Sequence, residues 1–181
     1  MIPGTYRAVL KLEGATGGAC AGVFWYHDDK SEIDIELVTP GDSIVIGTIN
    51  YTLHPSLASD GQPIPNATLS VPFNKRHLRP EDFHEYRFDS HPRRGVEFYF
   101  DGGLVHTSSH SVPLQGGNLQ FKVWADGDKW WSGTPSTSDV FMTVKTIDAY
   151  YNTSTSTSNE GWKKACAAAG GPSNKTVCTI G

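Results

Sequence analysis

Three acidic residues alternate with two isoleucines in the stretch Glu32-Ile33-Asp34-Ile35-Glu36. Because successive side chains of a β-strand point to opposite faces, a strand here places the three acids on one face and the isoleucines on the other. Acids are depleted in strands and like charges repel at this spacing, so local stability does not explain the pattern. The stretch therefore predicts a strand between an apolar core and a polar face that is either simply solvated or catalytic.

Paired carboxyl groups suit one reaction class in particular. Retaining glycosidases need an ionised nucleophile and a protonated acid about 5.5 Å apart. Glu32 and Glu36 start about 13 Å apart along an ideal strand, but two long side chains that lean together can close most of that distance. At 5.5 Å their charges repel by about 3 kcal/mol at an effective dielectric of 20, enough to separate the two pKa values by about two units. Asp34 lies between them and can set which one keeps its proton.

The run Ser31–Leu37 resembles the E-[ILV]-D-[IVF]-E signature of glycoside hydrolase family 16, the jelly-roll β-glucanases and related transglycosylases. The similarity covers roughly residues 4–151 and is nearest to secreted fungal members. Further segments fall in the family's order: Tyr6–Ala8, Gly22–Tyr26, Phe83–Tyr86, Val96–Gly102, Trp124–Asp128 and Trp131–Gly133.

This resemblance implies an all-β, concanavalin A-like jelly roll of two antiparallel sheets, with the acidic strand crossing a concave face. It implies that Glu32 is the nucleophile, Glu36 the acid/base and Asp34 an assisting residue. No cofactor is expected, and no metal site, because the histidines show no ligand spacing. The aromatic residues implied to bind substrate are Trp25, Trp124, Trp130 and Trp131.

The residues themselves support one of these aromatic assignments. In the run Gln120–Trp124, alternation places Trp124 on the polar face with Lys122. Flat apolar sugar faces stack on indole rings, so a tryptophan on a wet face favours a sugar platform. For Trp130 and Trp131 the alternative is that either one closes the end of the core.

Length and charge narrow the function classes further. A chain of 181 residues forms one domain with a real core, and its 19 Gly, 11 Pro and short alternating runs favour a β-sandwich over helices. A net charge of −4 offers no basic field to nucleic acid and no polybasic patch to a membrane. No apolar run approaches the roughly 18 residues of a membrane span, and residues 1–4 do not resemble a signal peptide. We expect a monomer that binds a neutral polysaccharide, a β-glucan.

Strands are predicted along most of the first 151 residues, and the proline-rich segment 54–72 is predicted as loop. Family members usually have further strands before Tyr6, so we expect a sheet edge or a wall of the binding site to be missing. Cys20 either lacks its partner for the same reason or is a buried free thiol. The predicted strands include Tyr6–Leu12, Ser43–Tyr51, Phe83–Asp89, Gly95–Phe100 and Val140–Tyr151.

Glycosylation sequons suggest a secreted or cell-wall protein. Four of the seven Asn residues lie in N-x-[ST] sequons, where composition predicts roughly one by chance. Asn66, Asn152 and Asn174 are the predicted glycosylation sites, and Asn66, which follows Pro63 and Pro65, is the best candidate for an exposed loop. Asn50 lies on an alternating run and either faces inward or lines the binding site.

The C-terminal part departs from the β pattern. We divide the chain into a jelly-roll domain (1–151), a Ser/Thr-rich linker (152–159) and an extension (160–181) with a short helix. Cys166 and Cys178 are close in sequence and are expected to pair, stabilising the extension by roughly 3 kcal/mol in the chain-entropy picture.

The predicted activity is retaining, endo-acting hydrolysis of β-1,3-1,4- or β-1,3-glucan. Two alternatives remain: a cell-wall glucan or chitin-glucan transglycosylase that uses the same residues, and an inactive carbohydrate-binding protein. Some family members insert a residue before the second Glu, which makes a β-bulge; Ile35 directly precedes Glu36 here, as in the mixed-linkage glucanases and the transglycosylases. The resemblance thus favours mixed-linkage glucan as substrate, with net retention at the anomeric carbon.

Overall fold

The described part of the chain consists of β-strands and the loops that connect them, apart from a few helical positions near the C-terminus. The computed structural model describes residues 4–41, 47–73 and 78–151, together with Gly161, Lys164, Ala167 and Ala168. The strands in these ranges are β1 (Gly4–Glu13), β2 (Ala19–Asp28), β3 (Ser31–Thr39), β4 (Thr48–Leu53), β5 (Thr68–Pro72), β6 (His84–His91), β7 (Gly95–Phe100), β8 (Gly103–Ser108), β9 (Asn118–Trp124) and β10 (Phe141–Tyr151).

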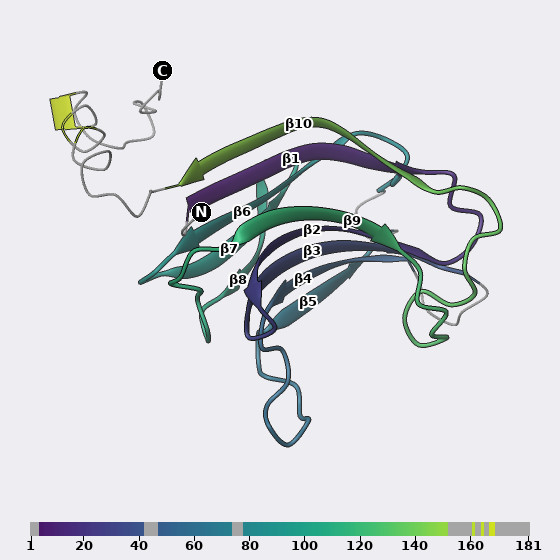
Figure 1. Ribbon diagram of the computed structural model, residues 1–181, viewed down its shortest axis with the longest axis horizontal. Helices are drawn as coiled ribbons and strands as arrows, with labels where there is room; N and C mark the ends of the chain where they lie inside the picture. Colours follow the sequence, from purple (N-terminus) through teal and green to yellow (C-terminus); the bar gives the residue numbers. More distant parts are fainter. Residues whose placement is uncertain are drawn as a thin grey trace.

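The strands form two five-stranded sheets that stack as a sandwich (Figure 1). One sheet has the order β10-β1-β6-β7-β8 and the other β5-β4-β3-β2-β9. All neighbouring strands are antiparallel. The predicted all-β sandwich of two antiparallel sheets is confirmed, and the acidic stretch lies on β3, the central strand of its sheet.

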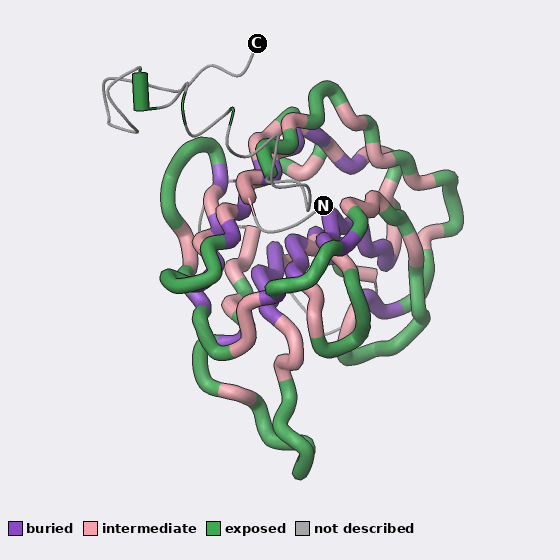
Figure 2. Tube along the Cα trace, turned by 60° about the vertical axis from the view of Figure 1, so that its left-hand side comes forward, coloured by how far each residue is buried: buried purple, intermediate pink, exposed green. Residues whose placement is uncertain are grey.

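The core lies between the sheets and follows the two-residue period of the strands. Figure 2 shows the buried residues gathered on the strands at the centre of the molecule. On β3 the inward residues Ile33, Ile35 and Leu37 are at most 1% exposed. Each large side chain buried in this way contributes about 1.5–3 kcal/mol, so a register slip of one residue would exchange the isoleucines for acids. The opposite sheet contributes Tyr6, Leu10, Leu12, Tyr86, Phe88 and Phe98.

One predicted loop is shorter than expected. Residues 68–72 form β5, an edge strand that pairs with β4, so the prediction of loop over 54–72 is wrong for its last five residues. The Pro72 that argued for loop closes the strand, where a missing N–H is tolerated at a sheet edge. Residues 54–67 do connect β4 to β5 without a strand.

The C-terminal extension is described at four positions only, and all four are helical. Cys166, Cys178, Asn152, Asn174 and the linker 152–159 lie outside the described residues, so the disulfide, two of the glycosylation sites and the domain boundaries stay predictions. Within the described part of the chain, no helix is long and apolar enough to cross a membrane.

Candidate active site

The three acids of β3 share the outer face of their sheet, as alternation predicts. Pairing of β3 with β2 and β4 runs from residue 33 to residue 36 without a register shift, so the predicted bulge-free strand is observed. Residues paired across antiparallel strands point to the same side and extend this face into rows. We define the acidic face as three rows: Glu36 with Gly22, Lys122 and Asn50; Asp34 with Phe24, Gln120 and Thr52; and Glu32 with Tyr26 and Asn118.

The acidic face is unusually sheltered for the outside of a sheet. Asp34 is only 3% exposed, and its neighbours Phe24, Asn50 and Thr52 are also buried. Glu32 and Glu36 are partly buried. Carboxyl groups removed from water in this way favour the neutral form, because the charged form loses hydration.

Burial separates the two catalytic candidates. It raises the pKa of Glu36 to about 8, and the negative charge of Asp34 adds to the effect. Burial likewise raises the pKa of Glu32, to about 7, again with a contribution from Asp34. Repulsion between the two glutamates was the predicted cause of the difference between their pKa values. In the structure, burial is the largest cause of the raised pKa of Glu36, and the charge of Glu32 is the smallest of its causes. The more buried residue is nevertheless the predicted acid/base.

His54 is a site residue that the sequence analysis missed. Its Nε2 lies 2.8 Å from Oδ2 of Asp34, and its backbone N–H donates to the carbonyl of Glu32 at 3.0 Å. The hydrogen bond to Asp34 raises the pKa of His54, which favours an imidazolium beside the carboxylate. The sequence contains one indication of this role. Asn50, Thr52 and His54 are spaced two residues apart, so in an extended segment all three point to the acidic face.

The same residues have the donors of a metal site. Glu32, Asp34 and His54 each offer one ligand atom, and these atoms lie within 4.8 Å of one another. In the structure the Asp34–His54 hydrogen bond engages two of the three donors. We therefore assign the cluster to carboxylate chemistry, in which Asp34 accepts a hydrogen bond from His54 and interacts with Glu32.

The prediction that Trp25 binds substrate is wrong. Trp25 pairs with Ile33 on β3, points into the core and is 1% exposed. Its neighbours Phe24 and Tyr26 face the acids instead, opposite Asp34 and Glu32 respectively. The prediction followed residue type, whereas the register of β2 against β3 places Phe24 and Tyr26, not Trp25, on the acidic face.

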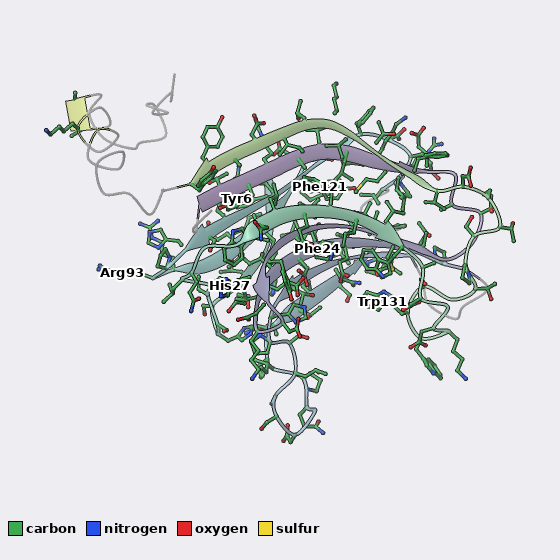
Figure 3. The ribbon with its side chains drawn as sticks, in the orientation of Figure 1. Tyr6, Phe24, His27, Arg93, Phe121 and Trp131 are labelled. Carbon is green, nitrogen blue, oxygen red and sulfur yellow. The ribbon has the colours of Figure 1, made fainter. Side chains whose placement is uncertain are left out.

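The other tryptophans lie as a group near one end of the acidic face. Trp124 is on this face, as predicted, and its ring lies 5.6 Å from that of Phe24. Trp131 contacts the thiol of Cys20, which pairs with Trp124, and Figure 3 shows Trp131 in the loop at the end of the sheet and Phe24 nearer its middle. Trp130 is 64% exposed, with Lys129 over its ring. Phe24 and Trp124 are thus in ring contact beside the carboxyls, but Phe24 is buried, so Trp124, Trp130 and Trp131 remain the predicted sugar-stacking residues.

The loop that follows β9 is fixed to the end of this sheet. The N–H groups of Gly18 and Gly41 donate to carbonyls of Thr134 and Ser132, and the Ser132 hydroxyl donates to Asp126 at 2.7 Å. Cys20 beneath this loop is fully buried, and burial raises the pKa of its thiol to about 12. Among the described residues Cys20 has no disulfide partner, which agrees with both predicted alternatives.

The two sequons that the structure describes differ in access. Asn66 is exposed in the loop between β4 and β5, so its side chain is accessible for the predicted glycosylation. Asn50 is 3% exposed on the acidic face beside Glu36, and within the described residues its Nδ2 has no hydrogen-bond partner. Asn50 therefore belongs to the site, where it offers a donor next to the predicted acid/base.

Comparison with known proteins identifies the fold. No family model and no curated protein matches the sequence. Among solved structures, the β-glucanase of Bacillus licheniformis is 22% identical, with a TM-score of 0.61 over 84% of this chain and 68% of its own. A Crh5 transglycosylase in complex with NAG is 19% identical, with a TM-score of 0.65 over 84% and 65%. The catalytic domain of a laminarinase, an endo-1,3-β-glucanase from Thermotoga petrophila, is 20% identical, with a TM-score of 0.55 over 84% and 65%.

The chain spans about two thirds of the length of these structures and shares their fold. The jelly roll implied by the resemblance to glycoside hydrolase family 16 is therefore the fold observed.

Proposed function

We propose that this chain, which has the jelly-roll fold of those glycosidases, is itself a retaining glycosidase that cleaves internal bonds of β-glucan. One observation carries the proposal: two glutamates on one face of an unbroken strand differ in burial, and the pKa of Glu36 (about 8) lies above that of Glu32 (about 7). Near pH 7.5 the favoured state thus has Glu32 ionised and Glu36 protonated, as double displacement requires.

In the first step, the Glu32 carboxylate attacks the anomeric carbon while Glu36 gives its proton to the glycosidic oxygen, so the leaving sugar departs as a neutral alcohol. A covalent glycosyl ester on Glu32 results. In the second step, Glu36, now ionised, takes a proton from the acceptor hydroxyl, which attacks the anomeric carbon and releases Glu32. Asp34, held by His54, accepts a hydrogen bond from Glu32 while Glu32 is protonated, which contributes to the raised pKa of Glu32.

Transglycosylation is the second candidate, since the same steps serve a sugar acceptor in place of water. The fold that the chain shares with a transglycosylase structure supports this candidate. Trp124 and Trp131, both partly exposed, would hold an acceptor sugar as readily as a donor.

A substrate panel tests the proposal. We expect the protein to cleave β-1,3-1,4-glucan at least as fast as β-1,3-glucan and to release the β-anomer first, as followed by proton NMR. An initial α-anomer would contradict double displacement. Products longer than the donor, formed from β-glucan or chito-oligosaccharides with added acceptor, would establish the transglycosylase. Binding without any product would make the protein a carbohydrate-binding module.

The pH dependence should be displaced toward neutrality. We expect kcat/KM to rise as Glu32 ionises near pH 7 and to fall as Glu36 loses its proton near pH 8, with a maximum between them. The measurement is kcat/KM on a soluble β-glucan from pH 4 to pH 10.

The control is Glu36→Gln assayed on an aryl glycoside with a good leaving group, which needs no acid in the first step. Its alkaline limb should disappear while the acidic limb stays. A parent profile that reaches its plateau by about pH 5, as ordinary carboxyls would give, contradicts the burial argument.

A further inference from the structure

Asn50 on β4 is the direct cross-strand partner of Glu36 on β3. The two strands pair without a register shift here, so both side chains point to the acidic face. Directly paired residues of antiparallel strands have Cβ atoms about 4.5–5.5 Å apart, a distance that an amide and a carboxyl group can bridge. On its other side Glu36 is paired with Gly22, which has no side chain. Asn50 is therefore the side chain that directly flanks Glu36 in its row.

The amide of Asn50 is buried, and only one end of it is used. Asn50 is 3% exposed, and its Oδ1 accepts a hydrogen bond from Oγ1 of Thr48 at 3.3 Å. Among the described residues, its buried Nδ2 has no hydrogen-bond partner. A buried donor without a partner destabilises a fold, so such groups are few in native proteins and each needs an explanation. Because Nδ2 is covered and does not reach a bound sugar, its partner has to come from the protein.

Glu36 has the complementary requirement. Burial keeps it neutral by raising its pKa to about 8, and the other causes of this shift are the charges of Asp34, His54 and Glu32, with no hydrogen bond among them. In the proposed reaction Glu36 gives its proton to the leaving oxygen and is then ionised in a place with little hydration. A buried carboxylate is stabilised when an N–H group donates to it. The unused donor of Asn50 thus lies opposite the group that comes to need one.

The charged groups around Glu36 do not supply this hydrogen bond. His54 is engaged with Asp34 at 2.8 Å. Lys122 is in the row of Glu36 but two strands away, and its Nζ lies 5.7 Å from the ring centroid of Phe24. Among the described residues, β5 presents no titratable group. The titratable groups that β2, β3, β4 and β9 and their following loops present near Glu36 are Glu32, Asp34, His54, Lys122, Tyr26, Cys20 and Asp126.

We propose that Asn50 is a positioning residue whose Nδ2 donates a hydrogen bond to the carboxylate of Glu36 once Glu36 has given its proton to the leaving sugar. The bond stabilises the charged state in which Glu36 acts as base in the second step. The Thr48 hydroxyl orients the amide, because it occupies Oδ1 and leaves Nδ2 as the free end. The proposal rests on the proposed function, because it takes Glu36 as the acid/base. The hydrogen bond to ionised Glu36 can nevertheless be measured without any substrate.

NMR of the parent protein tests the hydrogen bond directly. Nitrogen-15 spectra follow the side-chain NH₂ of Asn50, and carbon-13 spectra follow the carboxyl of Glu36, across a pH titration without substrate. The signals are assigned by their absence in Asn50→Asp and Glu36→Gln. We expect an NH₂ proton of Asn50 to move downfield with the midpoint of the Glu36 carboxyl, near pH 8, and to lose this response in Glu36→Gln. An Asn50 amide that does not respond to the ionisation of Glu36 overturns the proposal.

Two variants measure the size of the effect. Asn50→Leu removes the donor and nearly keeps the size, so the Glu36 midpoint should rise by about one pH unit, the effect of one hydrogen bond to a charged group. Asn50→Asp keeps the Thr48 contact and places an acceptor where Nδ2 was, so its rise should be at least as large.

The matched control is Ser70→Ala. Ser70 on β5 is exposed and pairs with Asn50 in the same row, but on the side away from Glu36. The Glu36 midpoint should keep its parent value in this variant. An equal rise in Ser70→Ala, or an unmoved midpoint in both Asn50 variants, contradicts the proposal.

Kinetics give a further readout. In Asn50→Leu the alkaline limb of kcat/KM should move upward with the Glu36 midpoint, the acidic limb should stay, and KM at the optimum should change less than about twofold. A raised KM with an unmoved alkaline limb overturns the proposal, since Asn50 would then contact the sugar. If the parent proves inactive on every glucan, the proposed function fails, while the NMR titrations still decide whether Asn50 donates to Glu36.

Discussion

Glu32→Gln is expected to lower turnover of β-glucan by at least about 10³-fold and to leave the fold and oligosaccharide binding intact. The amide preserves the size of the side chain but cannot form the glycosyl ester, so the loss falls on kcat and not on substrate affinity. Initial rates on the best glucan, circular dichroism and calorimetric titration with an oligosaccharide measure the three quantities. A Glu32→Gln protein as active as its parent would remove Glu32 from the mechanism.

Glu36→Gln is the matched variant and separates the two roles. It should lose most turnover of glucan, whose leaving group needs a proton, but keep far more of the first step on an aryl glycoside with a good leaving group. Glu32→Gln should be inactive on both substrates. If the aryl glycoside rescued Glu32→Gln and not Glu36→Gln, the two assignments would have to be exchanged.

Trp25→Ala should destabilise the protein by about 3–5 kcal/mol, the cost of a large aromatic cavity in a core. Trp25 is 1% exposed, and its packing is tight: a Cβ on Gly117 would lie 2.7 Å from Cζ2 of the indole. Urea denaturation measures the change. Affinity of the remaining folded protein for oligosaccharides should stay within about twofold of the parent, because Trp25 does not reach the acidic face.

Trp124→Ala is the comparison, since it removes the same side chain from the acidic face of the same sheet. We expect a stability loss of about 1 kcal/mol or less and oligosaccharide binding weaker by about tenfold, the value of one aromatic contact. A large stability loss in Trp124→Ala together with normal binding would place Trp124 in the core. Weak binding by folded Trp25→Ala would restore Trp25 to the substrate site.

The sequence alone predicted the face on which a residue lies wherever the two-residue alternation of a strand determines that face. Alternation on β3 and β9 correctly separated the acids from the isoleucines and placed Trp124 on the polar face. Trp25 was assigned by residue type, and the register of β2 against β3 reverses that assignment. Alternation within one strand shows which residues share a face. It does not show which of the two faces is buried, and that depends on how the strand pairs with its neighbour.

Other features depend on contacts that the local sequence does not contain. His54 reaches Asp34 because β4 pairs with β3 through Glu36 and Asn50, a register set across the intervening loop. The raised pKa values of the glutamates depend on burial, which the neighbouring strands and loops create together. The repulsion between two charges can be estimated from their spacing in the sequence. The cost of removing a carboxyl group from water can be estimated only when all the residues that cover it are known.

The sheltered carboxyls of β3 also couple folding to proton uptake. In the unfolded chain a glutamate releases its proton near pH 4.3, whereas the folded protein holds the protons of Glu32 and Glu36 to about pH 7 and 8. Between these limits the folded state binds more protons than the unfolded state, so stability falls as pH rises. The contribution is complete below pH 4 and lost above pH 8. In the proposed mechanism Glu32 must ionise to attack, so we expect the protein to be less stable at the pH where the pair would work than at acidic pH, where Glu32 keeps its proton.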